Sequence, residues 1–207
     1  EAISYEDAFT LVTKRARLMK EATLKNPGAM VAILGKTFKE VKDAVSSFND
    51  IYISNINSPQ QIVVGGKKDA IESFIQWCRK NLVKCVPLNV SGAFHTPLMR
   101  PAAELLAAEI DSTHFSICKF PVYANCNGAP VFQPDDIKRV LKEQIMAPVQ
   151  WVKIIESVSS SVDLIIEMGP KNILSSLIKK ISSDLQVFSF EDVASHRKIL
   201  EIMKLRT

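Results

Sequence analysis

Glycine is scarce in this sequence, and no pair of glycines frames a serine. The chain has seven glycines in 207 residues, and no serine stands in the pattern Gly-x-Ser-x-Gly. That pattern builds a sharp strand-to-helix turn that exposes a serine hydroxyl for nucleophilic attack. The sequence therefore does not display a serine nucleophile of this common kind.

Cysteines and long apolar runs are also few. The four cysteines, Cys78, Cys85, Cys118 and Cys126, do not have the spacing of a metal knuckle. A chain of this size needs no disulfide, so we expect reduced thiols and no metal site. No apolar run is long enough to span a membrane, and the start, EAISYEDAF, lacks the charged and apolar regions of a signal peptide. These absences favour a cytoplasmic protein that does not act at a membrane.

The charge balance is close to even. The formal net charge is +4, the hydrophobic fraction is 47% and the charged fraction is 23%, which is typical of a globular protein. So small a positive excess can help to attract an acidic partner or phosphates. It is weak support for nucleic-acid binding, and we expect no nucleic-acid partner.

Helical and strand patterns alternate most regularly in residues 29–90. Strands are predicted at 29–34, 51–56, 61–65 and 83–90, and helices at 37–48 and 67–81. The order β-α-β-β-α-β is that of a ferredoxin-like unit. We therefore expect residues 29–90 to form a small ferredoxin-like subdomain.

The remaining residues have the pattern of a larger α/β unit. A helix is predicted from Tyr5 to about Ala22, because Ser4 and Asp7 match a capping box. After residue 90 the pattern predicts a helix that begins after Thr96, further helices at 137–146, 151–158, 172–181 and 191–205, and strands at 121–125, 164–168 and 185–190. The strand at 164–168 is expected to be buried, in a mainly parallel sheet. Residues 1–28 and 91–207 are thus predicted to form one large α/β subdomain.

Five segments, in a fixed order, carry a family resemblance that covers essentially the whole chain. They are KRARLM (14–19) followed by GAM (28–30), NINSPQQIVVGG (55–66), VSGAFHTPLM (90–99), APVQW (147–151) and MGPKNIL (168–174). In these segments the sequence resembles the acyltransferase family of fatty-acid and polyketide synthesis. The resemblance implies an α/β-hydrolase-like large subdomain with an inserted ferredoxin-like small subdomain.

The resemblance also implies a reaction. In this family a serine takes a malonyl group from coenzyme A, and the phosphopantetheine thiol of an acidic acyl carrier protein takes it from the serine. Malonyl-CoA is a substrate, and no tightly bound cofactor is implied. The family's serine turn and oxyanion-hole loop precede the segment that EAISYEDAF resembles. We therefore expect this chain to be part of a longer protein, and the alternative is a natural homologue without a nucleophile.

Two residues are expected to carry the chemistry. His95 stands in a loop just before a predicted helix, whose positive end favours a neutral imidazole. The resemblance makes His95 the general base, whereas His114 and His196 have no such context. Arg15 matches the family arginine that binds the free carboxylate of malonyl, and a guanidinium suits that task because it can bind a carboxylate through two hydrogen bonds. Arg17, on another face of the same helix, is the less favoured choice.

Five further residues are implied by the resemblance. Gln150 matches a family glutamine whose segment packs beside the histidine and supports its orientation, often through a backbone carbonyl. Phe94 matches a position where a bulky side chain is typical of malonyl-selective members. Asn57 and Gln61 are expected to line the cleft between the subdomains. Lys84 is a candidate contact for cofactor phosphates or for the acidic carrier, although it could equally be a plain surface lysine.

Other functions stay open on the sequence alone. A serine hydrolase or thioesterase could use the same serine and histidine, but it would have no need for Arg15. A non-catalytic carrier-docking protein would explain the missing serine. RNA binding by the ferredoxin-like unit is disfavoured, because its strands lack the basic and aromatic pattern of RNA-recognition motifs.

Overall fold

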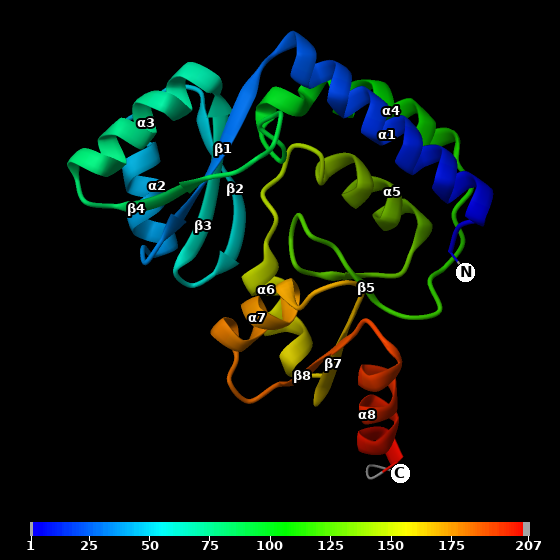
Figure 1. Cartoon of the computed structure of the whole chain (residues 1–207). Helices are drawn as coiled ribbons and strands as arrows, with labels where there is room; N and C mark the ends of the chain where they lie inside the picture. The colour runs from blue at the N-terminus through cyan, green and yellow to red at the C-terminus, as the bar shows by residue number, and fades with distance from the viewer. Residues whose placement is uncertain (1, 205–207) are drawn as a thin grey trace. The chain divides into compact units, whose positions relative to one another are not determined.

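The computed structural model describes residues 2–204 (Figure 1). The chain divides into two compact units, Glu1–Ile154 and Ile155–Thr207, and each is described by itself. No helix among the described residues is both long and apolar enough to cross a membrane.

The first unit mixes helices with two antiparallel sheets. Its strands are β1 (Gly28–Leu34), β2 (Ile51–Ser58), β3 (Gln61–Lys67), β4 (Lys84–Pro87), β5 (Val122–Tyr123) and β6 (Pro130–Val131). Its helices are α1 (Tyr5–Lys25), α2 (Phe38–Val45), α3 (Lys68–Lys80), the short 3₁₀ helix η1 (Pro97–Met99), α4 (Arg100–Ser112), α5 (Pro134–Glu143) and α6 (Trp151–Ser159), the last of which continues into the second unit.

The four-stranded sheet has the strand order β2-β3-β1-β4, and all of its pairs are antiparallel. Side chains of alternate residues point to opposite faces of a strand. One face carries Val31, Ile33 and Val64, which pack with buried residues of α2 and α3. Figure 1 shows these two helices together on one side of the sheet. The other face carries Met30, Ala32 and Val63, which pack against Phe94, so the chain from β4 into η1 returns across this second face.

Helix α1 begins where the capping pattern predicts. The Ser4 hydroxyl accepts a hydrogen bond from the Asp7 backbone N–H at 3.0 Å. The helix extends three residues beyond the predicted end and stops at Lys25, before Asn26 and Pro27. Its buried face, which includes Leu18 and Met19, packs on Leu106 and Ile110 of α4. Figure 1 shows the two helices side by side.

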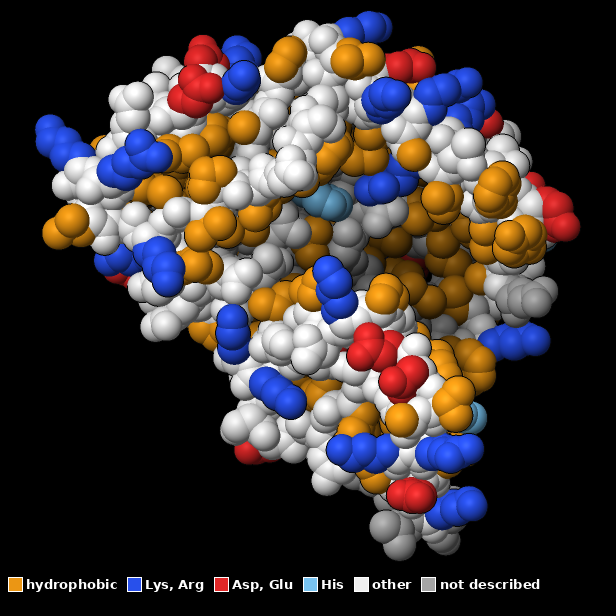
Figure 2. Space-filling view, viewed as in Figure 1, with side chains coloured by type: hydrophobic (Ala, Val, Ile, Leu, Met, Phe, Trp, Pro, Cys, Tyr) orange, Lys and Arg blue, Asp and Glu red, His pale blue; other side chains and the backbone are white. Residues whose placement is uncertain are grey.

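An apolar groove lies on the same unit. It has a volume of about 430 Å³ and is lined by side chains of α1, α5 and the β5–β6 region, among them Leu11, Val122 and Ile137. Val12 of α1 also lines the groove and is 66% exposed, and Phe9 of the same helix is 62% exposed. In Figure 2, hydrophobic side chains (orange) gather on the side of the molecule where α1 lies.

The second unit contains a parallel pair of strands, β7 (Leu164–Met168) and β8 (Gln186–Phe190), which are joined through α7 (Ile173–Ile181). Helix α8 (Val193–Lys204) follows. The Glu167 carboxylate accepts hydrogen bonds from the backbone N–H groups of Leu174 at 2.9 Å and Ser175 at 2.8 Å. It thereby caps the first turn of α7, whose N–H groups have no partners within the helix.

The α/β class is confirmed, and the predicted β-α-β-β-α-β order of elements is found in residues 28–87. The strand at 164–168 was predicted to be buried, and this was wrong, because it is only partly covered and Met168 is 70% exposed. A mainly parallel sheet is not found among residues 2–204, where only β7 and β8 form a parallel pair of strands. Leu205, in the last predicted helix, lies outside the described residues. The division into subdomains at 29–90 stays a prediction.

Candidate active site

The loop that carries His95 is held on both sides by close packing. Gly92 is buried against α1, because a Cβ at this position would lie 2.5 Å from the Thr23 Oγ1. Thr96 accepts a hydrogen bond from the Leu98 N–H at the start of η1, as the sequence predicts for a residue that caps a helix. His95 itself has a φ of 59°, a left-handed conformation that is uncommon outside glycine.

The His95 ring is oriented by a backbone carbonyl. Its Nδ1 lies 2.8 Å from the carbonyl oxygen of Gln144. Because a carbonyl oxygen can only accept, Nδ1 carries the proton and Nε2 is left with its lone pair. An imidazole in this tautomer can take a proton from a hydroxyl or a thiol.

The surroundings of His95 keep it neutral. Burial lowers the pKa of His95 below its usual value and the charge of Arg15 lowers it further, whereas hydrogen bonds with the backbone of Gln144 and of Ala147 raise it, and the net result is a lowered pKa. The charge of Arg15 acts on His95, so these two predicted residues lie within electrostatic range of each other although they are 80 positions apart in the sequence.

Arg15 differs from the other basic residues of its helix. It is half-buried, burial lowers the pKa of its guanidinium, and its Nε has no hydrogen-bond partner among residues 2–204. Lys14 instead forms an ion pair with Glu109, and the exposed Arg17 lies 3.8 Å from Glu21. Arg15 is thus the basic residue of this group with a donor, its Nε, that has no partner among residues 2–204 and could bind a carboxylate ligand.

Phe94 connects the sheet with the helical core. It is partly buried and packs against Met30 and Val63 on the open face of the four-stranded sheet. It also contacts the core cluster that α1 and α4 share. The ring therefore packs between the sheet and the helical core at the residue that precedes His95, and its role in limiting the size of an acyl group stays a prediction.

The segment that contains Gln150 is tied to the edge of the four-stranded sheet. Val149 donates to the Ser54 carbonyl and accepts from the Ile56 N–H, both at 2.8 Å. The Gln150 N–H donates to the Asn125 carbonyl at 2.7 Å. The carbonyl that orients His95 is that of Gln144, six residues earlier, so this part of the prediction named the wrong residue. A further role for the Gln150 side chain stays a prediction.

Asn57, Gln61 and Lys84 lie near one end of the four-stranded sheet. Gln61 and Lys84 are both paired with Leu34. Their neighbours Ile62 and Cys85 belong to the cluster on the helix-covered face. By the alternation of strand side chains, Gln61 and Lys84 point to the opposite face, which Phe94 contacts. Asn57 stands at an irregularity of β2, where the register shifts between Ile56 and Ser58, so the alternation does not assign its side chain to a face. The roles of the three residues stay predictions.

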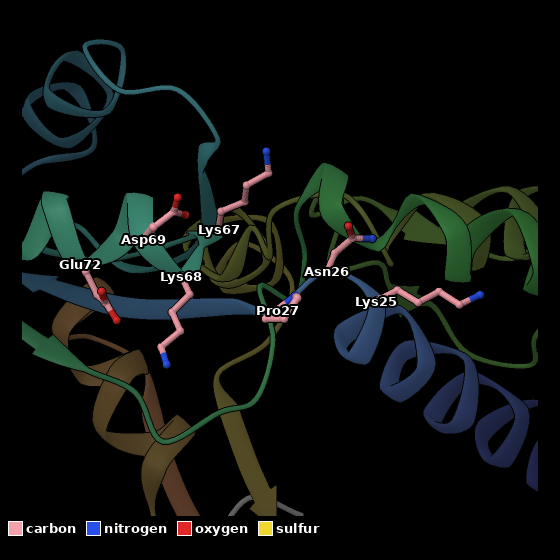
Figure 3. Close-up of a pocket in the computed structure, with 7 residues that line it drawn as sticks. All are labelled: Lys25, Asn26, Pro27, Lys67, Lys68, Asp69 and Glu72. Atoms are coloured by element: carbon pink, nitrogen blue, oxygen red, sulfur yellow. The ribbon is translucent and has the colours of Figure 1, made fainter.

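A second hollow in the first unit has none of these residues. It has a volume of about 480 Å³ and is lined by Lys25, Asn26, Pro27, Lys67, Lys68, Asp69 and Glu72. Figure 3 shows Lys67 and Lys68 pointing in opposite directions and Lys25 pointing away from both. Lys67 is moreover paired with Asp50 at 2.7 Å. The lysines therefore do not converge on a common ligand position.

Gln144 was missed by sequence reasoning for a physical reason. Only its backbone carbonyl binds His95, so the side chain at this position leaves no chemical signature of the contact.

The residues 2–204 also include no group of three or more His, Cys, Asp or Glu that could hold a metal ion.

Comparisons with known proteins identify a family. Residues 1–197 match the family described as acyl transferase domain. The chain is 34% identical to the malonyl CoA-acyl carrier protein transacylase of Bacillus subtilis, over 98% of this chain and 66% of that protein. It is 36% identical to the protein of the same name from Staphylococcus aureus, over 92% of this chain and 64% of that protein. The chain thus spans about two thirds of the length of these relatives.

Solved structures give the same result. The malonyl CoA-acyl carrier protein transacylase of Clostridium perfringens matches with a TM-score of 0.92 and 32% identity, over 99% of this chain and 66% of that chain. A type II PKS acyl-carrier protein in complex with its malonyl-transacylase supplies a second match, with a TM-score of 0.91, 32% identity, and coverage of 97% and 66%. Since the family match extends over nearly all of the sequence, this chain belongs to the acyl transferase domain family.

Proposed function

We propose that the complete protein transfers a malonyl group from coenzyme A to the phosphopantetheine thiol of an acyl carrier protein. The observation that carries the proposal is the pairing of an oriented, neutral imidazole at His95 with a half-buried Arg15 whose Nε is unpaired among the described residues. The names of the relatives support it, since both curated proteins are malonyl CoA-acyl carrier protein transacylases.

The proposed reaction has two acyl-transfer steps through an ester of serine. The Nε2 of His95 takes the serine proton while the serine oxygen attacks the thioester carbonyl, and coenzyme A leaves as a thiol with that proton. The carrier thiol then gives its proton to the same nitrogen, attacks the ester, and returns the serine hydroxyl. Because the 207 residues contain no Gly-x-Ser-x-Gly, the proposal requires a serine supplied from outside them.

Arg15 gives the proposal its substrate class. Its guanidinium would bind the free carboxylate of the malonyl group, with charge-assisted hydrogen bonds that an acetyl group cannot form. A hydrolase that uses the same serine and histidine would not need this arginine. A carrier-docking protein without catalysis would not need a partly buried, oriented histidine.

The remaining parts of the proposal concern partners and place. The net charge of +4 favours an acidic carrier, and Lys84 is exposed on the sheet face that Phe94 contacts. No tightly bound cofactor is needed, because the serine and histidine supply the chemistry and malonyl-CoA is a substrate. We place the protein in the cytoplasm, where its four free thiols would stay reduced.

The deciding experiment compares two acyl groups in Arg15→Ala, made in the complete protein. Loading from malonyl-CoA should fall by about 10- to 100-fold, since a hydrogen bond to a charged group contributes roughly 1.5–3 kcal/mol. Loading from acetyl-CoA should change little. Arg17→Ala is the matched control, because Arg17 lies on the same helix but is exposed and faces Glu21. Equal losses for both acyl groups, or rapid release of free malonate by the parent protein, would overturn the proposal.

A further inference from the structure

The backbone of His95 needs support from its surroundings. A φ of 59° at a residue with a side chain costs free energy and persists only where neighbouring contacts enforce it. The hydrogen bond from Nδ1 to Gln144 fixes the ring, but it does not fix the backbone of the loop. Some other contact must therefore hold the loop in this conformation.

The side chain of Thr96 closes the loop around His95. Its hydroxyl donates to the carbonyl oxygen of Ala93 at 2.6 Å and accepts from the Leu98 N–H at 3.3 Å. The first bond bridges the two residues that enclose Phe94 and His95, so it shapes the turn in which His95 stands. Thr96 is completely buried, so it is unavailable to substrate.

The methyl group of Thr96 rests on a glycine of the sheet. A Cβ at Gly65 would lie 3.2 Å from the Thr96 Cγ2 and 2.7 Å from the Ser54 Oγ. Gly65 belongs to β3, which has β1 and β2 as its neighbours. Because Gly65 has no side chain, the methyl group of Thr96 can pack directly against the backbone of this inner strand.

We propose that Thr96, whose methyl group packs on Gly65, is the positioning residue for His95. It holds His95 in its left-handed conformation, with Nδ1 hydrogen-bonded to the Gln144 carbonyl. Thr96 acts in two ways, because the hydroxyl closes the turn and the methyl group anchors it to the sheet. The kinetic part of this inference rests on the proposed function of His95 as a base. The structural part does not, because the tautomer of the ring can be measured without any reaction.

The test uses Thr96→Val and Thr96→Ser in the complete protein. Valine keeps a methyl group against Gly65 but removes the hydroxyl, whereas serine keeps the hydroxyl. We expect Thr96→Val to lower the malonyl loading rate at saturating malonyl-CoA by about 10- to 100-fold, the effect of a misplaced catalytic group, with a KM within about twofold of the parent. Thr96→Ser should retain most of the rate. Ser54→Ala is the matched control, since the buried Ser54 Oγ faces the same glycine but has no hydrogen-bond partner among residues 2–204.

The second readout is the tautomer of His95, measured by NMR of protein with ¹⁵N-labelled histidine above the histidine pKa. The parent should show the Nδ1–H tautomer, in a signal that His95→Gln removes. Thr96→Val should shift this signal toward the Nε2–H tautomer, and Thr96→Ser and Ser54→Ala should not. If Thr96→Val fails to fold, Thr96→Ala against Thr96→Ser provides the same comparison, because these two variants differ only in the hydroxyl.

The outcomes separate the inference from the proposed function. An unchanged Nδ1–H signal in Thr96→Val overturns the inference, whether or not the loading rate falls. A rate loss of the same size in Thr96→Ser also overturns it. A parent protein that never loads malonyl defeats the proposed function, and the tautomer comparison then decides the positioning role alone.

Discussion

At the scale of single residues, the best-defined group is the His95 imidazole, whose two ring nitrogens have different expected tasks. Nδ1 is bound to the Gln144 carbonyl, and Nε2 is therefore the nitrogen that can accept a proton. Because burial, as the largest cause, lowers the pKa of His95, the ring stays neutral to a lower pH than an ordinary histidine. A neutral imidazole is the form that could act as a base at neutral pH.

Replacement of His95 tests that conclusion. In the complete protein, His95→Ala should slow formation of the acyl-serine by about 10²- to 10⁴-fold, the usual contribution of a general base. The loading rate of the parent should fall in acid as the imidazole takes a proton. Its midpoint should lie below the ordinary histidine pKa, because the pKa is lowered. The measurement is rapid-quench loading with labelled malonyl-CoA across a pH series.

The control for this experiment is His114→Ala, since His114 is exposed and lies outside the contacts of the site. The His114→Ala protein should have the same malonyl loading rate as the parent and the same fall of that rate at acidic pH. Binding of malonyl-CoA to His95→Ala should change far less than loading, because Arg15 remains. A His95→Ala protein that loads at nearly the parent rate, with the same acid limb, would remove His95 from the mechanism.

Phe94 carries the prediction on acyl selectivity. Its ring packs between the sheet face and the helical core, so it can exclude an added methyl group on the substrate. Phe94→Ser should raise the use of methylmalonyl-CoA relative to malonyl-CoA, and one methyl group is worth about 1–3 kcal/mol of discrimination. The measurement is the ratio of kcat/KM for the two substrates. Phe120→Ser, at a position that is 77% exposed, serves as the control, and an unchanged ratio in Phe94→Ser would contradict the prediction.

The sequence could indicate these residues only as far as side chains carry information. His95 and Arg15 stand in segments that resemble a family, and the structure brings the two together. The hydrogen bond of Gln144 is made by its backbone, and any residue could supply that carbonyl. The left-handed φ of His95 was equally hidden, because the loop sequence around it contains no signal for a positive φ at histidine.

At the scale of elements, α7 depends on a carboxylate from the preceding strand. Glu167 accepts hydrogen bonds from Leu174, from the Ser175 N–H and from the Ser175 hydroxyl. Burial raises the pKa of Glu167, but these hydrogen bonds together lower it by more, and the net pKa is below the ordinary value. A carboxylate with a lowered pKa stabilises the folded state above its ordinary pKa, and this contribution is lost as the pH falls through the lowered value.

Glu167→Ala should therefore reduce the free energy of unfolding by about 0.5–2 kcal/mol at neutral pH, the usual effect of losing a helix cap. The difference from the parent should shrink in acid, once the parent carboxylate is protonated. Urea unfolding at several pH values measures this difference in the free energy of unfolding. Glu201→Ala is the control, because Glu201 is exposed on α8. A difference that stays constant down to the most acidic pH would show that the charge of Glu167 does not act as the cap.

Elements with strong local signals were predictable, and those that depend on partners were not. The capping residues of α1 and α2 and the apolar runs of β1 and β3 are present in the sequence itself. Strand β6 has only two residues, and it is a strand because it pairs with β5. Strand β4 ends at Pro87, three residues before the predicted end, because the chain there leaves its pairing with β1 and turns toward the histidine loop.

At the scale of the whole chain, the predicted site depends on contacts between distant segments. Position 15 on α1, positions 94 and 95 in the loop and position 144 after α5 come together in the first unit. Each of these segments looks ordinary alone, and only the fold makes them a site. The chain also spans about two thirds of the length of its curated relatives, so the proposed activity belongs to the complete protein.

The last prediction concerns the apolar surface of the first unit when the 207-residue chain is studied alone. Tyr5, Phe9 and Val12 of α1 are exposed by 79%, 62% and 66%, next to the apolar groove of about 430 Å³. A contiguous apolar surface of this kind is typical of an interaction site. We therefore expect the isolated chain to associate with itself in a concentration-dependent way, which sedimentation velocity over a concentration series can measure.

Two variants make the expectation specific to this surface. Phe9→Lys combined with Val12→Lys should shift the isolated chain toward the monomer, since it places charges on the exposed face of α1 while the buried Leu18 and Met19 stay unchanged. Leu82→Lys is the control, because Leu82 is 94% exposed but stands in the turn between α3 and β4. It should associate like the parent, since a single exposed apolar residue contributes little. A parent chain that stays monomeric and unfolds cooperatively at every concentration would mean that this surface needs no partner.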